Sequence, residues 1–105
     1  MSPDVEFTTK AAGLLLRMQA EHRNLVVLLD DTSYYTNSNV MARENPPTWP
    51  VDLLSEKDGV RVYINPVLRK SLQTAWVVID VLDFADDSFS LETKFGKRFF
   101  KSAAS

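Results

Sequence analysis

The run Trp76–Leu82 (WVVIDVL) constrains the fold more than any other segment of this chain. It is rich in β-branched and aromatic residues, which favour strands, and its apolar residues fall at both odd and even positions. Both faces of such a strand must be covered, so we expect it in the middle of a sheet or sandwich. The short apolar segment 24–29 (NLVVLL), which Asp30 and Asp31 follow, also fits a buried strand better than a helix. Two central strands are therefore predicted.

Two hairpins are predicted around these strands. Segments 51–54 and 60–64 flank the turn sequence EKDG, and the second segment alternates apolar and polar residues as a half-buried strand requires. Near the C-terminus, 88–93 also alternates, and 97–100 follows across a turn at Gly96.

Two helices complete the expected secondary structure. Segment 9–22 (TKAAGLLLRMQAEH) places apolar residues three and four positions apart, and Thr8 or Thr9 can cap its start. An asparagine followed by a proline predicts the start of a second, short helix over 65–74. The residues on the apolar face of the first helix are Ala11, Leu14, Leu15, Met18 and His22.

The length of 105 residues fits one domain, and 45% hydrophobic with 25% charged residues is the balance of a folded globule. We therefore predict a mainly β (α+β) fold, a β-sandwich with an N-terminal helix and one short internal helix. Its core would run over roughly 5–101. A long loop would occupy 30–50, and 102–105 would form a short disordered tail.

Several functions are excluded by composition. The chain has no cysteine, which removes disulfide frameworks, zinc ribbons, iron–sulfur clusters and cysteine nucleophiles. It has one histidine and three isolated glycines, so neither a multi-histidine metal site nor a glycine-rich phosphate loop is expected. The net charge is −2, and the sequence shows neither a secretory signal nor an apolar run long enough to span a membrane. We expect a cytoplasmic, non-enzymatic protein without a cofactor.

The loop 30–50 is the first candidate for a binding site. Loops of about 20 residues without secondary structure are uncommon in compact domains unless they bind something or are mobile. This one offers aromatic rings and amide groups of the kind that line contacts with proteins or small ligands. Its candidate contact residues are Tyr34, Tyr35, Asn37 and Trp49.

Carboxylates near the single histidine offer a second hypothesis. Such groups bind metal ions when they converge. Asp30 and Asp31 are also explained as turn residues, and His22 as a cation at the C-terminal end of the first helix. The alternative is a weak metal-binding carrier with oxygen and nitrogen ligands from Asp30, Asp31, His22 and Glu44.

Basic and aromatic residues interleave in 94–101 (KFGKRFFK), as they do in single-stranded nucleic-acid binders. The candidate contacts are Lys94, Lys97, Arg98 and Phe99. On a strand, however, Lys97 and Phe99 would face one side and Arg98 the other, so charges and rings would not form one platform. An amphipathic edge hairpin is therefore favoured over nucleic-acid binding.

Four segments, LLRMQAEH, VDLLSEKDGVRVYI, VVIDVLDF and FSLETKFGKRF, together resemble the DUF779 family of small proteins and, more distantly, the HesB/IscA iron–sulfur carriers. The resemblance covers about 9–101 and implies a β-sandwich-like, HesB-like domain with an N-terminal helix. Family members carry a cysteine pair and a later cysteine in the loop after the first strand. At those positions this chain has Ser33, Tyr34 and Met41, so the family's thiolate chemistry is not expected here.

The resemblance and the loop together predict a non-catalytic, cysteine-free relative of that family. It would contact an unknown protein or a small ligand through 30–50, including Ser33 and Met41. Homodimerisation is a further expectation, because small mainly β domains with exposed strands often pair.

Overall fold

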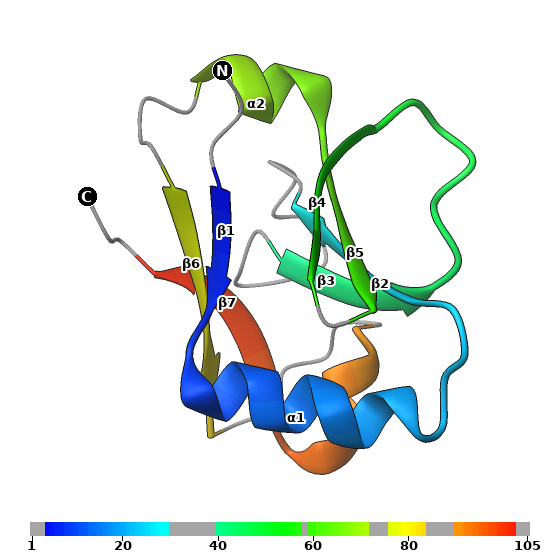
Figure 1. The fold of residues 1–105 in the computed structure, drawn as a ribbon, viewed down its shortest axis with the longest axis vertical. Coiled ribbons are helices and arrows are strands. Elements are labelled where there is room, and N and C mark those ends of the chain that lie inside the picture. Colours follow the sequence, from blue (N-terminus) through cyan, green and yellow to red (C-terminus); the bar gives the residue numbers. More distant parts are fainter. Residues whose placement is uncertain (1–3, 30–39, 58, 72–75, 84–89, 103–105) are drawn as a thin grey trace.

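The computed structural model describes residues 4–29, 40–57, 59–71, 76–83 and 90–102. Within these residues the chain forms seven strands in two sheets, two α-helices and one 3₁₀ helix (Figure 1). The fold is thus mixed α+β with strands as its main component, as expected. None of the helices in the described ranges is long and apolar enough to cross a membrane.

The first sheet has the order β1-β6-β7. Its strands are β1 (Asp4–Phe7), β6 (Trp76–Leu82) and β7 (Arg98–Ser102). The predicted central position of β6 is confirmed, since it pairs in parallel with β1 and antiparallel with β7.

The second sheet has the order β3-β2-β5-β4. Its strands are β2 (Leu25–Leu29), β3 (Val40–Glu44), β4 (Asp52–Lys57) and β5 (Val60–Ile64). All five residues of β2 are buried, and β2 lies between β3 and β5, which confirms the second predicted central strand. The antiparallel pairing of β4 with β5 confirms the first predicted hairpin.

Helix α1 (Thr9–Gln19) crosses one end of both sheets, and α2 (Pro66–Ser71) lies at the opposite end (Figure 1). Thr8 caps α1, because its hydroxyl accepts a hydrogen bond from the backbone N–H of Ala11 at 3.2 Å. Asn65 caps α2, accepting from the backbone N–H of Val67 at 2.8 Å. Both helices were expected, but α1 ends at Gln19 rather than at residue 22.

Three predictions about secondary structure are wrong. Strand β3 lies inside the predicted loop 30–50, where it extends the second sheet beside β2. The alternating segment near the C-terminus forms a 3₁₀ helix, η1 (Leu91–Phe95), which ends at Gly96 with a φ of +69°. Strand β7 therefore pairs with β6, and the second hairpin does not form. Strand β1, which had no prediction, takes a parallel register beside β6.

The core lies between the two sheets and is closed at one end by α1. Its fully buried members include Val5 from β1, Met18 from α1, Val27 from β2, Ile79 from β6 and Phe99 from β7. The predicted alternation in β5 is confirmed, because its first, third and fifth residues are buried while the two between them are more exposed. Those two residues are Arg61 and Tyr63, and they face away from the core.

Candidate functional site

The structure describes only part of the predicted contact segment 30–50. Met41, Glu44 and Trp49 lie in the described part, as does His22. The remaining candidates of the loop and of the metal hypothesis lie outside the described residues; they are Asp30, Asp31, Ser33, Tyr34, Tyr35 and Asn37.

Met41 lies on the outer face of the second sheet, the face directed away from the core. Strand pairing places it in one cross-strand row of four residues, whose other members come from β2, β5 and β4. Leu28 in this row is 1% exposed, whereas Leu53 is 53% exposed. The row is Met41, Leu28, Tyr63 and Leu53, and it is apolar except for one phenol group.

A second row crosses the same face one pleat further along. It carries Arg43, Val26, Arg61 and Glu56. Arg61 donates from Nε to Oε2 of Glu56 at 3.3 Å. Hydrogen bonding and charge from Tyr63, and then from Glu56, raise the pKa of Arg61. We refer to the two rows together with Trp49 as the outer face.

Trp49 belongs to the outer face because its ring lies against Arg43. The guanidinium carbon of Arg43 is 5.3 Å from the centroid of the Trp49 ring, which is cation–π geometry. Trp49 is nevertheless 46% exposed. The connection from β3 to β4 that carries it contains three prolines, of which Pro47 is buried. Proline restricts the backbone, so the exposed indole is presented from a stiff segment.

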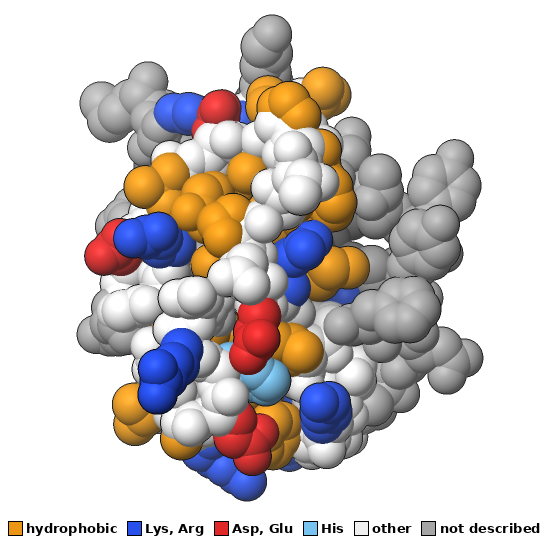
Figure 2. Space-filling model, turned by 90° about the vertical axis from the view of Figure 1, so that its right-hand side faces the viewer, with side chains coloured by type: hydrophobic (Ala, Val, Ile, Leu, Met, Phe, Trp, Pro, Cys, Tyr) orange, Lys and Arg blue, Asp and Glu red, His pale blue; other side chains and the backbone are white. Residues whose placement is uncertain are grey.

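Figure 2 views the molecule from the side of the β3–β4 connection. Hydrophobic side chains gather in the upper part of this view, and basic side chains border them. The single histidine lies lower, with acidic side chains beside it.

His22 and Glu44 are brought together at the junction of α1, β2 and β3. The distance from Nδ1 of His22 to Oε1 of Glu44 is 2.7 Å, with 12% and 49% of the two side chains exposed. The Glu44 carboxylate can only accept a hydrogen bond, so Nδ1 of His22 carries the proton and donates it. The second ring nitrogen, Nε2, takes no part in this hydrogen bond. Nε2 is buried and has no hydrogen-bond partner among the described residues. The expected role of His22 as the last residue of the helix is replaced by this pairing across to β3.

Two asparagines hold the same junction. The backbone N–H of Asn45 donates to the carbonyl of Asn24 at 2.9 Å, and the Asn24 amide donates to Oδ1 of Asn45 at 3.0 Å. Asn45 adopts a φ of +64°, a conformation that asparagine tolerates better than most residues. A polar hollow of about 300 Å³ lies beside them; it is lined by Asn24, Leu25, Val26, Asn45, Pro46 and Arg61.

The structure brings together two of the four proposed metal ligands, His22 and Glu44. The described residues contain no group of three or more histidine, aspartate or glutamate side chains that could hold a metal ion. A tight zinc site needs three or four protein ligands, so the described residues alone do not form one.

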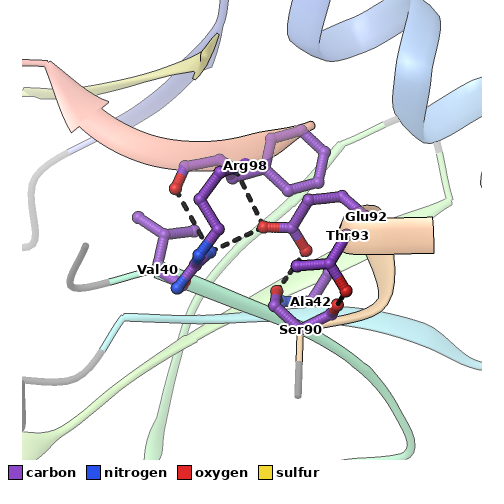
Figure 3. A network of polar contacts seen from close by, with 7 residues as sticks. Val40, Ala42, Ser90, Glu92, Thr93 and Arg98 are labelled. Carbon is purple, nitrogen blue, oxygen red and sulfur yellow. Dashed lines mark hydrogen bonds and ion pairs between the residues drawn. The ribbon is translucent and has the colours of Figure 1, made fainter. Parts of the chain in front are cut away.

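The largest polar cluster of the described chain is fully buried (Figure 3). Oε2 of Glu92 accepts from Nη1 of Arg98 at 2.6 Å and from the backbone N–H of Phe99 at 2.8 Å, while Oε1 accepts from the Ser90 hydroxyl. The cluster also reaches β3, because Nη1 of Arg98 donates to the Val40 carbonyl at 2.7 Å. Ser90, Glu92 and Arg98 are only 0–1% exposed. Their side chains connect the two sheets and cannot contact a ligand.

The cluster changes the nucleic-acid hypothesis. Arg98 and Phe99 are both 0% exposed, so neither can contact a phosphate or a base. Lys94 is exposed. Nζ of Lys97 lies 2.6 Å from Oδ1 of Asp83, and this ion pair lowers the pKa of Asp83. The charged and aromatic platform that nucleic-acid binding would require therefore does not form from these four residues, in agreement with the prediction from strand alternation.

Sequence reasoning missed Arg43, Arg61 and Tyr63 as members of the outer face. The alternation of β5 could have identified the last two, because inward-facing valines at 60 and 62 force Arg61 and Tyr63 outward. Arg43 could not be found in this way while β3 was assigned to a loop.

Comparison with family models, with curated proteins and with solved structures finds no match for this chain.

Proposed function

We propose that this chain is a non-catalytic binding domain whose protein partner contacts the accessible side chains of the outer face, including Met41 and Trp49, whereas Leu28 and Val26 of the same rows are buried. The observation that carries the proposal is the Trp49 ring, held against Arg43 and yet 46% exposed. A large aromatic side chain in a fixed position loses little conformational freedom on binding. Tryptophan, tyrosine and arginine dominate binding energy at protein interfaces, and methionine is enriched there.

The composition of the outer face supports a protein partner. Exposed Leu53 and half-buried Met41 and Tyr63 share one row, with arginines in the next. A polar rim around apolar and aromatic residues is the usual anatomy of an interface that forms and dissociates.

The family relationship and the cellular location are proposals as well. We infer that the chain is a cysteine-free relative of the DUF779 and HesB-like proteins and that it acts in the cytoplasm. The four similar segments and a two-sheet fold with a helix before the second sheet support this relationship.

The test compares partner capture by the wild type and by Trp49→Ala. Proteins retained from a native lysate are quantified, and the principal one is purified and titrated by calorimetry. Loss of an interface tryptophan costs about 2 kcal/mol or more, so we expect binding to weaken by about 30-fold. The control is Val67→Ala, which shortens a side chain that is 66% exposed on α2. The proposal fails if no protein is retained, or if Trp49→Ala binds as tightly as Val67→Ala.

The His22–Glu44 pair favours a second candidate, a weak carrier for a divalent metal ion. Metal content and thermal stability in added Mn²⁺, Zn²⁺ or Fe²⁺ are measured for the wild type and His22→Gln. A bound metal would raise the melting temperature of the wild type alone. Equal curves for both proteins, with no metal in the purified wild type, would exclude this candidate.

A further inference from the structure

The stripe of α1 directly opposite its buried side carries no charged residue, while the exposed charges of the helix, Lys10 and Arg17, lie along one flank of that stripe. Leu14, Leu15 and Met18 are buried against the sheets. The positions on the opposite side of the helix are all exposed, and they are Thr9, Gly13, Leu16 and Ala20. Leu16 is the most exposed large hydrophobic residue in the described chain, at 70%. Surface helices normally present charged and polar residues on this side, so the uncharged stripe requires an explanation.

A mostly apolar groove runs along one flank of this stripe. It has a volume of about 590 Å³ and lies between α1, the end of β1 and the turn of the β4–β5 hairpin. Its apolar lining consists of Phe7, Ala12, Gly13, Leu15, Leu16 and Val60. The space over Gly13 is open, since a Cβ atom there would meet nothing within 4 Å. Leu16 thus projects beside a groove that could receive a side chain of its own type.

The other flank of α1 carries opposite charges at its two ends. Lys10 lies in the first turn of α1, and Glu21 lies two residues beyond its end, where the His22 N–H still donates to the Met18 carbonyl at 2.9 Å in the helical pattern. The two side chains are therefore placed on the same flank, about three turns apart. Arg17 lies between them, with its guanidinium carbon 5.2 Å from the centroid of the Phe95 ring. When two copies of a helix pack antiparallel about a two-fold axis, the same flanks meet with their ends exchanged. Lys10 of each copy would then face Glu21 of the other.

We propose that this side of α1 is an interface with a second copy of the same chain. The helices pack antiparallel, and Leu16 of each copy occupies the apolar groove of the other. A second copy is the occupant that the surface itself specifies, because one face supplies the projecting side chain, the groove and both halves of the ion pair. This interface does not include Trp49, so its test is independent of the proposed function.

The size of the interface predicts its strength. Helix α1 has 11 residues and is about 16 Å long, so the contact buries less than the roughly 1,200–2,000 Å² of a stable complex. We therefore expect a weak dimer that dissociates on dilution.

The experiment is sedimentation equilibrium over a wide range of protein concentrations. The wild type should form a dimer as concentration rises, and Leu16→Glu should remain a monomer because it places a charge in the apolar groove. Val67→Glu is the matched control, since it adds the same charge at an exposed apolar position on α2, and it should dimerise like the wild type. Circular dichroism checks that each variant is folded.

Charge exchange tests the antiparallel arrangement. Lys10→Glu and Glu21→Lys should each weaken self-association by about tenfold, because two-fold symmetry turns two attractions into two repulsions. The double variant Lys10→Glu/Glu21→Lys should associate like the wild type. An equimolar mixture of the two single variants should form a heterodimer, since both contacts are again attractive. A wild type that is monomeric at every concentration, or a dimer that Leu16→Glu or the charge exchanges leave unchanged, would overturn the proposal.

Discussion

Arg98 and Glu92 form an ion pair in the interior, with Nη1 of Arg98 2.6 Å from Oε2 of Glu92 and side-chain exposures of 1% and 0%. The pair does not stand alone, because Glu92 also accepts from the backbone N–H of Phe99 and from Ser90. Charges are tolerated inside a protein when they are paired and their remaining hydrogen-bonding groups are satisfied.

The cluster also closes one edge of the second sheet. Strand β3 is the edge strand, so some of its backbone groups have no neighbouring strand. Two of these backbone groups form hydrogen bonds with side chains instead. The Val40 carbonyl accepts from Arg98, and the Ala42 N–H donates to Ser90 Oγ at 2.8 Å. The cluster therefore connects the edge of the second sheet to η1 and to β7 of the first sheet (Figure 3).

Arg98→Ala should lower the free energy of unfolding by about 3–5 kcal/mol, because it leaves the buried Glu92 carboxylate without its cation. This is a large part of the about 5–15 kcal/mol that stabilises an ordinary domain. Urea denaturation followed by circular dichroism measures the loss. Arg69→Ala is the control; Arg69 pairs with Asp52 at 3.0 Å, but both side chains are more than a third exposed.

The double variant Arg98→Met/Glu92→Gln isolates the ion pair itself. Its loss should be smaller than the sum of the losses from the two single replacements, because no uncompensated charge remains. Additive losses in this cycle would show that the two charges do not depend on each other.

Ser90→Ala should destabilise the fold by about 1–3 kcal/mol. Ser90 is 1% exposed and serves two partners at once, accepting from the Ala42 N–H and donating to Glu92. Its removal leaves a buried N–H without an acceptor. Thr48→Ala provides the comparison, since Thr48 is exposed and its loss should change the urea midpoint little. Equal midpoints for the two variants would contradict the role assigned to Ser90.

Local signals predicted the central strands, the β4–β5 hairpin and both helix starts. Each of these depends on residues close together in the sequence: the apolar run of β6, the alternation of β5, and the caps Thr8 and Asn65. Parallel pairing, as between β1 and β6, joins residues about 70 positions apart. Nothing in the four residues of β1 indicates that partner.

The errors at 40–44 and 91–95 have one physical cause, the buried polar cluster. Alternation in 88–93 suggested a strand with Glu92 on the wet side, yet Glu92 is 0% exposed because Arg98 and Phe99 supply its partners. Arg98 and Ser90 of the same cluster hold β3 in place after a polar, turn-prone segment, through hydrogen bonds with the Val40 carbonyl and the Ala42 N–H. A pattern of apolar and polar residues cannot reveal an ion pair that is satisfied inside the protein, and Arg98 was for that reason placed on the surface. Of the candidate site, Met41 and Trp49 were identified, while the arginines beside them were not.

Asp80 should make the stability of the fold depend on pH in the acid range. A hydrogen bond from the Thr8 hydroxyl at 2.8 Å, and then one from the Val81 N–H, hold the pKa of Asp80 below its usual value of 3.8. A lowered pKa in the folded state stabilises the protein at pH values above that usual value. This contribution disappears as the pH falls below that value and through the lowered one.

Thr8→Ala should reduce this loss of stability at acid pH, because it removes the main cause of the lowered pKa. It should also cost about 1 kcal/mol at every pH through the lost helix cap. Thr8→Ser keeps the hydroxyl and should follow the wild type. The measurement is the urea midpoint of the three proteins between about pH 6 and pH 3. Parallel curves for wild type and Thr8→Ala would show that this hydrogen bond does not affect the titration of Asp80.

Gly59→Ala should lower the free energy of unfolding more than Gly96→Ala does. Both glycines have positive φ, +80° and +69°, where a Cβ atom costs about 1–2 kcal/mol. At Gly59 the new Cβ would also lie 3.2 Å from Nε2 of Gln19 on α1, whereas at Gly96 it would meet nothing within 4 Å. Urea denaturation of both variants measures the difference. Repeating Gly59→Ala in a Gln19→Ala background should bring its cost down to that of Gly96→Ala, because only the backbone strain then remains. If Gly59→Ala lowers the free energy of unfolding just as much in that background, the contact between residue 59 and Gln19 does not contribute to the loss.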